Sequence, residues 1–180
     1  DVLDRSTGLF DNDTYSWLTR ANFHLDARTE TELGTLRSYM EISFNEQSDV
    51  DAVTGAAISG NGGATIEHAY IQLGGFTLGY SDSLFETLTD SAGALVINDS
   101  IVGYTPGKAN FVAYTFDAGN GFSATLGLEA GAGANYIDSY VPHVVVGASY
   151  TQGWGSISGV VGYDSNFSEW AGKLRADITI

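Results

Sequence analysis

The stretch WLTRANFHLDAR, residues 17–28, alternates between two kinds of side chain. One set of alternate positions is apolar or small: Trp17, Thr19, Ala21, Phe23, Leu25 and Ala27. From Arg20 onward, the other set is polar: Arg20, Asn22, His24, Asp26 and Arg28. Because neighbouring side chains of a β-strand point to opposite faces, this period of two predicts a strand with one apolar and one charged face.

The same alternation recurs along the chain and predicts about nine strands, with no helix of consequence. The expected strands cover residues 17–28, 36–45, 66–73, 76–80, 110–116, 122–128, 143–150, 157–164 and 170–179. Glycine-containing turns are expected at residues 32–34, 74–75, 120–121 and 152–155, since Gly and Asn-Gly favour hairpin turns. Residues 1–14, 47–63 and 131–141 are expected to be loops. The chain is therefore predicted to be all-β and antiparallel, with tight turns alternating with longer loops.

The charged face of these strands limits the possible architectures. Its charges are Arg20, His24, Asp26, Arg28, Arg37, Glu41, Lys173, Arg175 and Asp177. Such charges cannot share a dry core, so they face either bulk water, as on a β-sandwich, or a water-filled lumen. Apolar-out, polar-in strands with short turns at one end are typical of an antiparallel up-and-down transmembrane β-barrel. Periodicity favours the barrel, and the sandwich remains the alternative.

Aromatic side chains gather near both ends of the expected strands. Beside the tight turns lie Phe76, Phe116, Phe122 and Trp154, and at the opposite ends lie Trp17, Phe44, Tyr80, Tyr163 and Trp170. Two such rows are typical of the aromatic girdles at membrane interfaces. The predicted lipid-facing residues are Trp17, Phe23, Leu25, Met40, Ile42, Leu78, Val112, Tyr114, Leu126, Ile157, Val161 and Leu174. We then expect an arginine to be unfavourable at Leu126 and tolerated at neighbouring Thr125.

Residues 82–108 separate two expected strands and are far too many for a hairpin turn. Loops of this length are uncommon in compact folds and are usually functional or disordered. Ser83 and Glu86 form a capping-box pattern, which predicts a short helix. The loop carries enough apolar side chains to pack against something: Leu84, Phe85, Leu88, Leu95, Val96, Ile97, Ile101 and Val102. Its charges before Lys108 are all acidic: Asp82, Glu86, Asp90 and Asp99.

Composition argues against several functions. The chain has 7 Lys and Arg, 22 Asp and Glu and a net charge of −15, which disfavours nucleic acid as a partner. Cysteine is absent, which removes disulfides and thiolate chemistry. Neighbouring arginines disfavour a metal at His24 and Asp26, and they make a catalytic pair of Asp26 and Glu41 improbable. We therefore expect no enzyme activity, no metal and no cofactor.

Five stretches resemble the general porins of alpha-proteobacteria, which are trimeric, sixteen-stranded proteins of the outer membrane. They are TETELGTLRSYMEISFN (residues 29–45), HAYIQLGGFTLG (68–79), VINDSI (96–101), YTFDAGNGFSATLGLE (114–129) and GWGSISGVVGYDSNFSEWAGKLRADI (153–178). The resemblance implies that residues 1–180 form one partial barrel domain lacking the family's first strand and last six strands. It also implies that residues 82–108 are the pore-narrowing third loop, and that residues 47–63 contact a neighbouring subunit of a homotrimer.

These observations predict a channel in the bacterial outer membrane, embedded in lipid, for passive diffusion of small hydrophilic solutes and ions. The alternative is a soluble or secreted all-β carbohydrate-binding module. A positive wall is expected to face the acidic loop across the pore: Arg20, Arg28, Arg37, Lys173 and Arg175. Opposed charges at a narrow constriction would create a transverse field that filters polar solutes.

Overall fold

The structure is a computed structural model that describes residues 2–4, 9–11, 17–50, 57–59, 63–89 and 107–179. Nine long strands are β3 (Trp17–Thr31), β4 (Gly34–Val50), β6 (Ala64–Leu73), β7 (Phe76–Asp82), β8 (Lys108–Asp117), β9 (Phe122–Glu129), β10 (His143–Gln152), β11 (Gly155–Asp164) and β12 (Glu169–Ile178). Three short strands are β1 (Val2–Asp4), β2 (Leu9–Asp11) and β5 (Ala57–Ser59). The helical elements are α1 (Leu84–Thr87) and the 3-10 turn η1 (Gly133–Asn135). Within the described ranges, no helix has the length and apolarity to cross a bilayer.

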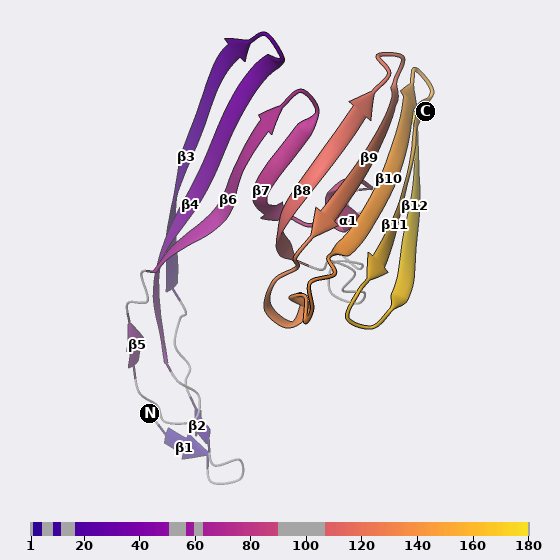
Figure 1. Cartoon of the computed structure of the whole chain (residues 1–180). Coiled ribbons are helices and arrows are strands. Elements are labelled where there is room, and N and C mark those ends of the chain that lie inside the picture. Colours follow the sequence, from indigo (N-terminus) through magenta and orange to yellow (C-terminus); the bar gives the residue numbers. More distant parts are fainter. Residues whose placement is uncertain are drawn as a thin grey trace. The chain divides into compact units, whose positions relative to one another are not determined.

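The long strands pair in an up-and-down order, which confirms the predicted topology. The order in the sheet is β12-β11-β10-β9-β8-β7-β6-β4-β3, with β5 paired to β4. Successive neighbours in β6 to β12 are antiparallel. Figure 1 shows these hairpins following one another along the chain.

Two ranges expected to be loops contain strand instead. β4 continues to Val50 and pairs with β5, which places extended backbone inside residues 47–63. β1 and β2 pair within residues 1–14. Both ranges are polar and lack clear alternation, and backbone pairing does not require an apolar face. Those two loop predictions were wrong for the paired residues.

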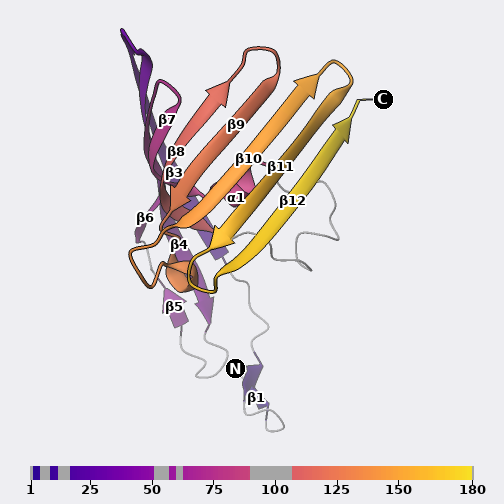
Figure 2. The ribbon, with the colours of Figure 1, turned by 45° about the vertical axis from the view of Figure 1, so that its right-hand side comes forward.

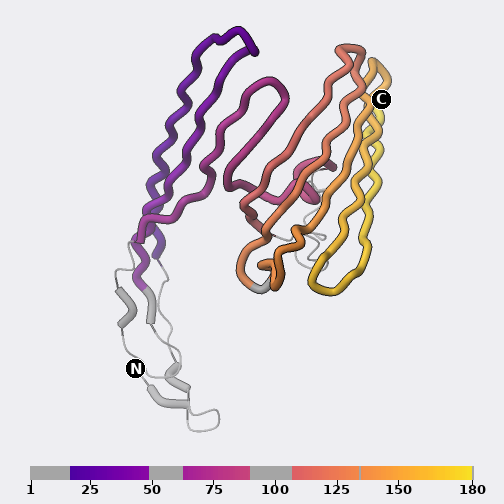
Figure 3. The backbone as a smooth tube through the Cα atoms, in the orientation of Figure 1, coloured from indigo at the N-terminus to yellow at the C-terminus, as the bar shows by residue number. Residues whose placement is uncertain are grey.

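The chain divides into two units, which are described separately. The first comprises residues 1–25 and 40–67, and the second comprises residues 26–39 and 68–180. In the second unit, the strands from β7 to β12 form a curved sheet, and α1 lies on its concave side (Figures 1 and 2). Figure 3 shows tight turns between β8 and β9 and between β10 and β11 at one end of this sheet. The longer connection of residues 130–142 lies at the other end.

The two faces of the second unit's sheet differ sharply in burial. The side chains on the face that carries α1 include the buried Phe111, Ala113, Val145 and Val160. The opposite face exposes large apolar side chains, as predicted: Leu78, Val112, Tyr114, Leu126, Ile157, Val161 and Leu174. In β3, Trp17, Phe23 and Leu25 are also exposed, whereas Met40 and Ile42 of β4 are half-buried.

Thr125 lies on the α1 face, but it is not an open position. Its side chain is 6% exposed, and its Oγ1 lies 2.9 Å from Thr115 Oγ1. An arginine there would have to displace packed neighbours and would break a hydrogen bond. The expectation that Thr125 tolerates arginine was therefore wrong, although its face was predicted correctly.

Candidate functional site

The helix α1 begins directly after β7 and is capped by Ser83. The Ser83 hydroxyl accepts a hydrogen bond from Phe85 N at 3.2 Å, and Ser83 O accepts one from Thr87 N at 3.0 Å. A short helix was expected here, and it is confirmed. The cap hydroxyl, however, accepts from the second helical residue, whereas Glu86 N bonds the Ser83 carbonyl at 3.0 Å. The first helical N–H, that of Leu84, bonds to a different strand.

That strand is β9, and the acceptor is its last residue, Glu129. Glu129 Oε1 accepts a hydrogen bond from Leu84 N at 2.6 Å, and Oε2 accepts one from Ser83 Oγ at 2.8 Å. Glu129 is 4% exposed and Ser83 is 0% exposed. The carboxylate thus satisfies one of the helix's unpaired N–H groups while joining the loop to the sheet. Sequence reasoning missed this residue, because a glutamate at a strand end looks like an ordinary exposed side chain.

Three glycines form the surface on which α1 rests, and we call them the glycine floor: Gly127, Gly147 and Gly162. They lie on β9, β10 and β11, where Val145 is the register partner of both Gly127 and Gly162. A Cβ at Gly127 would overlap Leu84 Cδ1. A Cβ would lie 2.7 Å from Leu88 Cδ1 at Gly147 and 2.9 Å from Phe85 Cδ2 at Gly162. The helix therefore occupies space that any larger side chain would fill.

Apolar contacts complete the seat of α1. Leu84 is 8% exposed and belongs to a buried cluster with Phe111, Ala113, Val145 and Val160, against which Phe85 and Leu88 pack. The expectation that the loop's apolar residues pack against something is confirmed for these three. The other apolar residues of that set lie outside the described residues: Leu95, Val96, Ile97, Ile101 and Val102.

The two ends of the long loop are tied together at its base. Ser83 N donates to Gly107 O at 2.9 Å, and Lys108 Nζ lies 3.0 Å from Asp82 Oδ1. Asp82 and Lys108 are also register partners at the ends of β7 and β8. The loop thus leaves and re-enters the sheet at one point, and the charge of Asp82 is paired there.

Two basic residues of β12 contact the loop directly. Lys173 Nζ lies 4.8 Å from the centre of the Phe85 ring, and Arg175 Nη1 donates to Thr89 O at 3.3 Å. Arg175 also pairs with Asp177 at 2.8 Å. The expected position of these two side chains, across the pore from the loop, is corrected: they lie beneath its first turns.

A second basic group in the second unit is built around Asp26. Its Oδ2 lies 2.9 Å from Arg28 Nη2 and 3.0 Å from Arg37 Nη2. Arg37 also donates to Gln72 Oε1 at 3.2 Å, and its guanidinium lies 5.0 Å from the centre of the Tyr39 ring. One carboxylate thus fixes and partly compensates two arginines on the charged face.

The charged face of β3 continues in the first unit. Arg20 Nε donates to Asn45 Oδ1 at 2.6 Å. Glu41 accepts from Asn22 Nδ2 at 3.2 Å and lies 3.5 Å from His24 Nδ1. These cross-strand contacts are polar pairs of the kind expected on a hydrated face, where side chains on adjacent strands bond one another.

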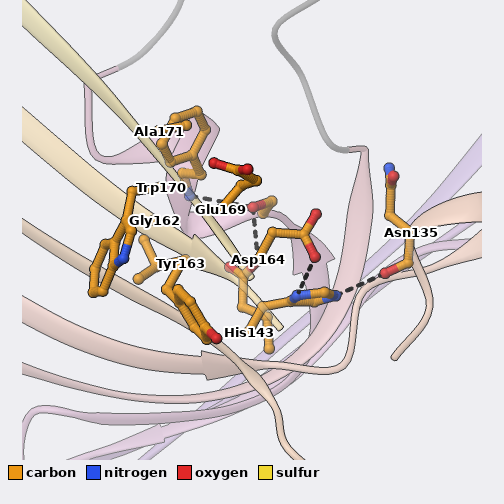
Figure 4. Close-up of a pocket in the computed structure, with 12 residues that line it drawn as sticks. Asn135, His143, Gly162, Tyr163, Asp164, Glu169, Trp170 and Ala171 are labelled. Carbon is orange, nitrogen blue, oxygen red and sulfur yellow. Dashed lines mark hydrogen bonds and ion pairs between the residues drawn. The ribbon is translucent and has the colours of Figure 1, made fainter. Parts of the chain in front are cut away.

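A cavity of about 270 Å³ lies beside α1 at the loop end of β9 to β12. Figure 4 shows His143 between Asp164 and Asn135 in its wall. His143 Nδ1 accepts from Ser165 N at 3.1 Å, and its Nε2 lies 2.9 Å from Asn135 O. These contacts match an imidazole with its proton on Nε2, and they join the two neighbouring loops. Across the part of the chain that the structure describes, no three His, Asp or Glu side chains gather as a metal site would require.

Comparison with known proteins identifies the family. A family model described as "Porin subfamily" matches residues 5–180. The chain belongs to the porin subfamily. Porin Omp2b of Brucella canis is 44% identical over 183 residues, covering 94% of this chain and 50% of that protein. Porin Omp2b of Brucella suis biovar 1 is 44% identical over 182 residues, covering 93% and 49%. The chain therefore spans about half the length of the curated relatives it matches. The crystal structure of the outer membrane channel DcaP of Acinetobacter baumannii matches with a TM-score of 0.46 and 14% identity, covering 92% of this chain and 58% of that one.

Membership of the porin subfamily confirms the predicted fold class and location. The sheet of this porin is part of an antiparallel transmembrane β-barrel in the bacterial outer membrane. In barrels of this kind the apolar face of the strands is the outward face and the polar face lines the lumen. In this chain α1 lies on the face opposite the exposed apolar side chains. A soluble carbohydrate-binding module is not supported by these findings.

The predicted site residues of this porin lie in different parts of the fold. Arg28, Arg37 and Arg20 lie in charged pairs or hydrogen bonds on the polar face, and Lys173 and Arg175 contact the loop. Asp82 is at the base of the loop, and Glu86 is in α1. Asp90 and Asp99 lie outside the described residues.

Replacing Asp26 by Asn is expected to make the full-length porin more selective for anions. The change removes the carboxylate shared by Arg28 and Arg37 and leaves two guanidinium charges uncompensated in the lumen. The measurement is the reversal potential across a planar bilayer at about 0.1 M salt, where charges act over about 10 Å.

The matched control is Glu30→Gln on the same strand, which removes an equal charge from a residue that bonds Thr35. A shift with Asp26→Asn no larger than with Glu30→Gln would contradict a role for the paired arginines in selectivity.

Proposed function

We propose that this porin contributes to a water-filled channel through which small hydrophilic solutes and ions diffuse passively, without catalysis. The observation that carries the proposal is the position of α1, which Glu129 and the glycine floor hold against the lumen face. A loop held there occupies cross-section that would otherwise be open to solutes. The exposed apolar face on the other side of the sheet suits contact with lipid.

We further propose that residues 82–108 form the constriction and that the full-length protein is a homotrimer in the membrane. Support for the constriction comes from the loop's entry into the lumen and from its acidic residues. Support for the trimer is the resemblance to general porins. Arg20, Arg28 and Arg37 supply positive charge on the lumen wall, and Lys173 and Arg175 supply it beside the loop.

Neutralising Glu86, Asp90 and Asp99 together in the full-length protein is expected to shift selectivity toward anions. These acidic side chains would otherwise attract cations to the narrowest part of the pore. Reversal potentials in a planar bilayer measure the shift. It should fade at 1 M salt, where the screening length falls to about 3 Å.

The control neutralises Glu46, Asp49 and Asp51, which lie in and beside the segment proposed to contact a neighbouring subunit. This triple variant should move the reversal potential much less. An unchanged potential for the loop variant at low salt would mean that the loop does not line the constriction.

A further inference from the structure

Glu129 is a buried ionisable group that passive diffusion does not require. It is 4% exposed, and its carboxylate accepts hydrogen bonds from two donors of the loop, Ser83 Oγ and Leu84 N. Burying a carboxyl group is costly unless such bonds compensate it. Both bonds cross from β9 to the loop, with a sequence separation of 46 residues for Ser83 and 45 for Leu84. The Glu129 carboxylate thus connects the end of β9 to the beginning of the loop.

We propose that Glu129 is a positioning residue whose bonds to Ser83 and Leu84 form a latch that keeps α1 seated on the glycine floor. The inference deepens the proposed channel function, on which it rests for any effect on conduction. The latch itself concerns only the position of α1 on the sheet. It is testable whether or not the loop narrows a pore.

The helix needs such a latch because it is too short to persist without outside contacts. It has four residues, and the first turn of a helix costs more conformational entropy than its one or two hydrogen bonds return. Apolar packing of Leu84, Phe85 and Leu88 favours burial but is not directional. The two bonds to Glu129 specify which end of the helix meets which strand.

Losing the latch leaves two donors without their acceptor. Ser83 is 0% exposed, so its hydroxyl would lose a buried hydrogen bond while the helix stays seated. Lifting the helix would expose both donors to the lumen, where water can satisfy them. Removing Glu129 therefore lowers the free energy of the unseated state relative to that of the seated state.

The test measures how often the helix lifts. Val145 is 3% exposed and lies in the cluster beneath Leu84, and the chain contains no cysteine. In the full-length, membrane-inserted protein, with any cysteine outside this chain replaced, Val145→Cys gives one thiol that is almost fully covered while the helix is seated. A membrane-impermeant maleimide should therefore reach it mainly when the helix lifts. Its labelling rate then follows the population of the lifted state.

Glu129→Ala should speed labelling about tenfold or more, because a buried hydrogen bond to a charged group is worth at least that factor in an equilibrium. Ser83→Ala, which removes one latch bond together with the cap bond to Phe85 N, should also speed labelling. Glu129→Gln keeps an acceptor for Leu84 N and should fall closer to the parent. Glu169→Ala, at an exposed carboxylate in the wall of the neighbouring cavity, should leave the rate unchanged.

Labelling no faster than in the parent in both Glu129→Ala and Ser83→Ala would overturn the latch. If Glu129→Ala does not insert into membranes, an unchanged rate in Ser83→Ala alone overturns it. Single-channel recordings of the same variants test the link to conduction separately. Faster labelling with an unaltered conductance trace would support the latch and count against residues 82–108 as the constriction.

Discussion

Alanine at all three positions of the glycine floor is expected to unseat α1 and to give the full-length porin a larger and less steady single-channel conductance. Each new methyl group meets the helix: at Gly127 it overlaps Leu84, and at Gly162 it lies 2.9 Å from Phe85 Cδ2. Overpacking of a well-packed contact costs roughly 1–3 kcal/mol per site. Three such sites beneath a four-residue helix act on its apolar contacts together, because Leu84, Phe85 and Leu88 each meet one of the new methyl groups.

Planar-bilayer recordings of the triple variant Gly127→Ala, Gly147→Ala, Gly162→Ala provide the measurement. The matched control is Gly153→Ala, Gly159→Ala, Gly172→Ala. A Cβ at Gly153 meets nothing within 4 Å, and at Gly159 and Gly172 the nearest atoms are 3.4 Å away. The control also adds three alanines, two on strands and one in the turn between β10 and β11, but none of them meets α1. Only the floor variant should therefore change conductance. Identical traces for the two variants would contradict a helix seated in the pore.

Arginine at Leu126 is expected to destabilise the membrane-inserted protein by about 2–4 kcal/mol, the cost of this side chain at the bilayer midplane on a barrel's lipid face. Leu126 is 52% exposed, and its register partners Tyr114 and Val146 expose apolar side chains on the same face. An arginine at this position would bring a charge into contact with acyl chains. Denaturant titration of the protein folded into lipid vesicles measures the loss.

A lumen-facing serine supplies the control for Leu126→Arg. Ser149 lies on β10, is half-buried, and bonds Ser123 at 2.9 Å on the lumen side. Ser149→Arg loses that modest bond but keeps its charge in water, so it should cost clearly less than Leu126→Arg. Equal losses at the two positions would mean that the exposed apolar face does not contact lipid.

The strands of this fold could be predicted because their two faces meet different solvents. Leu126 and Thr125 differ in polarity for that reason, and the resulting period of two identifies the strand in the sequence. The extension of β4 to Val50 could not be predicted in the same way, since its final residues are polar and its pairing with β5 uses backbone groups alone. Where neither face is apolar, strand and loop have the same composition.

The contacts between α1 and the sheet could not be predicted from sequence patterns, for a different reason. Gly127, Gly147 and Gly162 look like positions that weaken a strand, and only the register of three strands places them under one helix. Glu129 and Ser83 are distant in sequence, and nothing in either local pattern indicates the other. Likewise Lys173 and Arg175 were placed on the correct face, but contact with Phe85 and Thr89 depends on the path of the loop.

The closed base of the loop also bears on how this protein can change over evolution. Ser83 N–H bonds Gly107 O, and Asp82 pairs with Lys108, so the hairpin of β7 and β8 is complete before the loop begins. The entropic cost of closing a flexible insertion rises only with the logarithm of its length, and a doubling adds about 0.6 kcal/mol. Residues between the docked helix and Gly107 can therefore be lengthened, shortened or replaced at little cost to strand pairing. Under the constriction proposed for residues 82–108, changes in solute preference and changes in barrel stability could therefore be inherited separately.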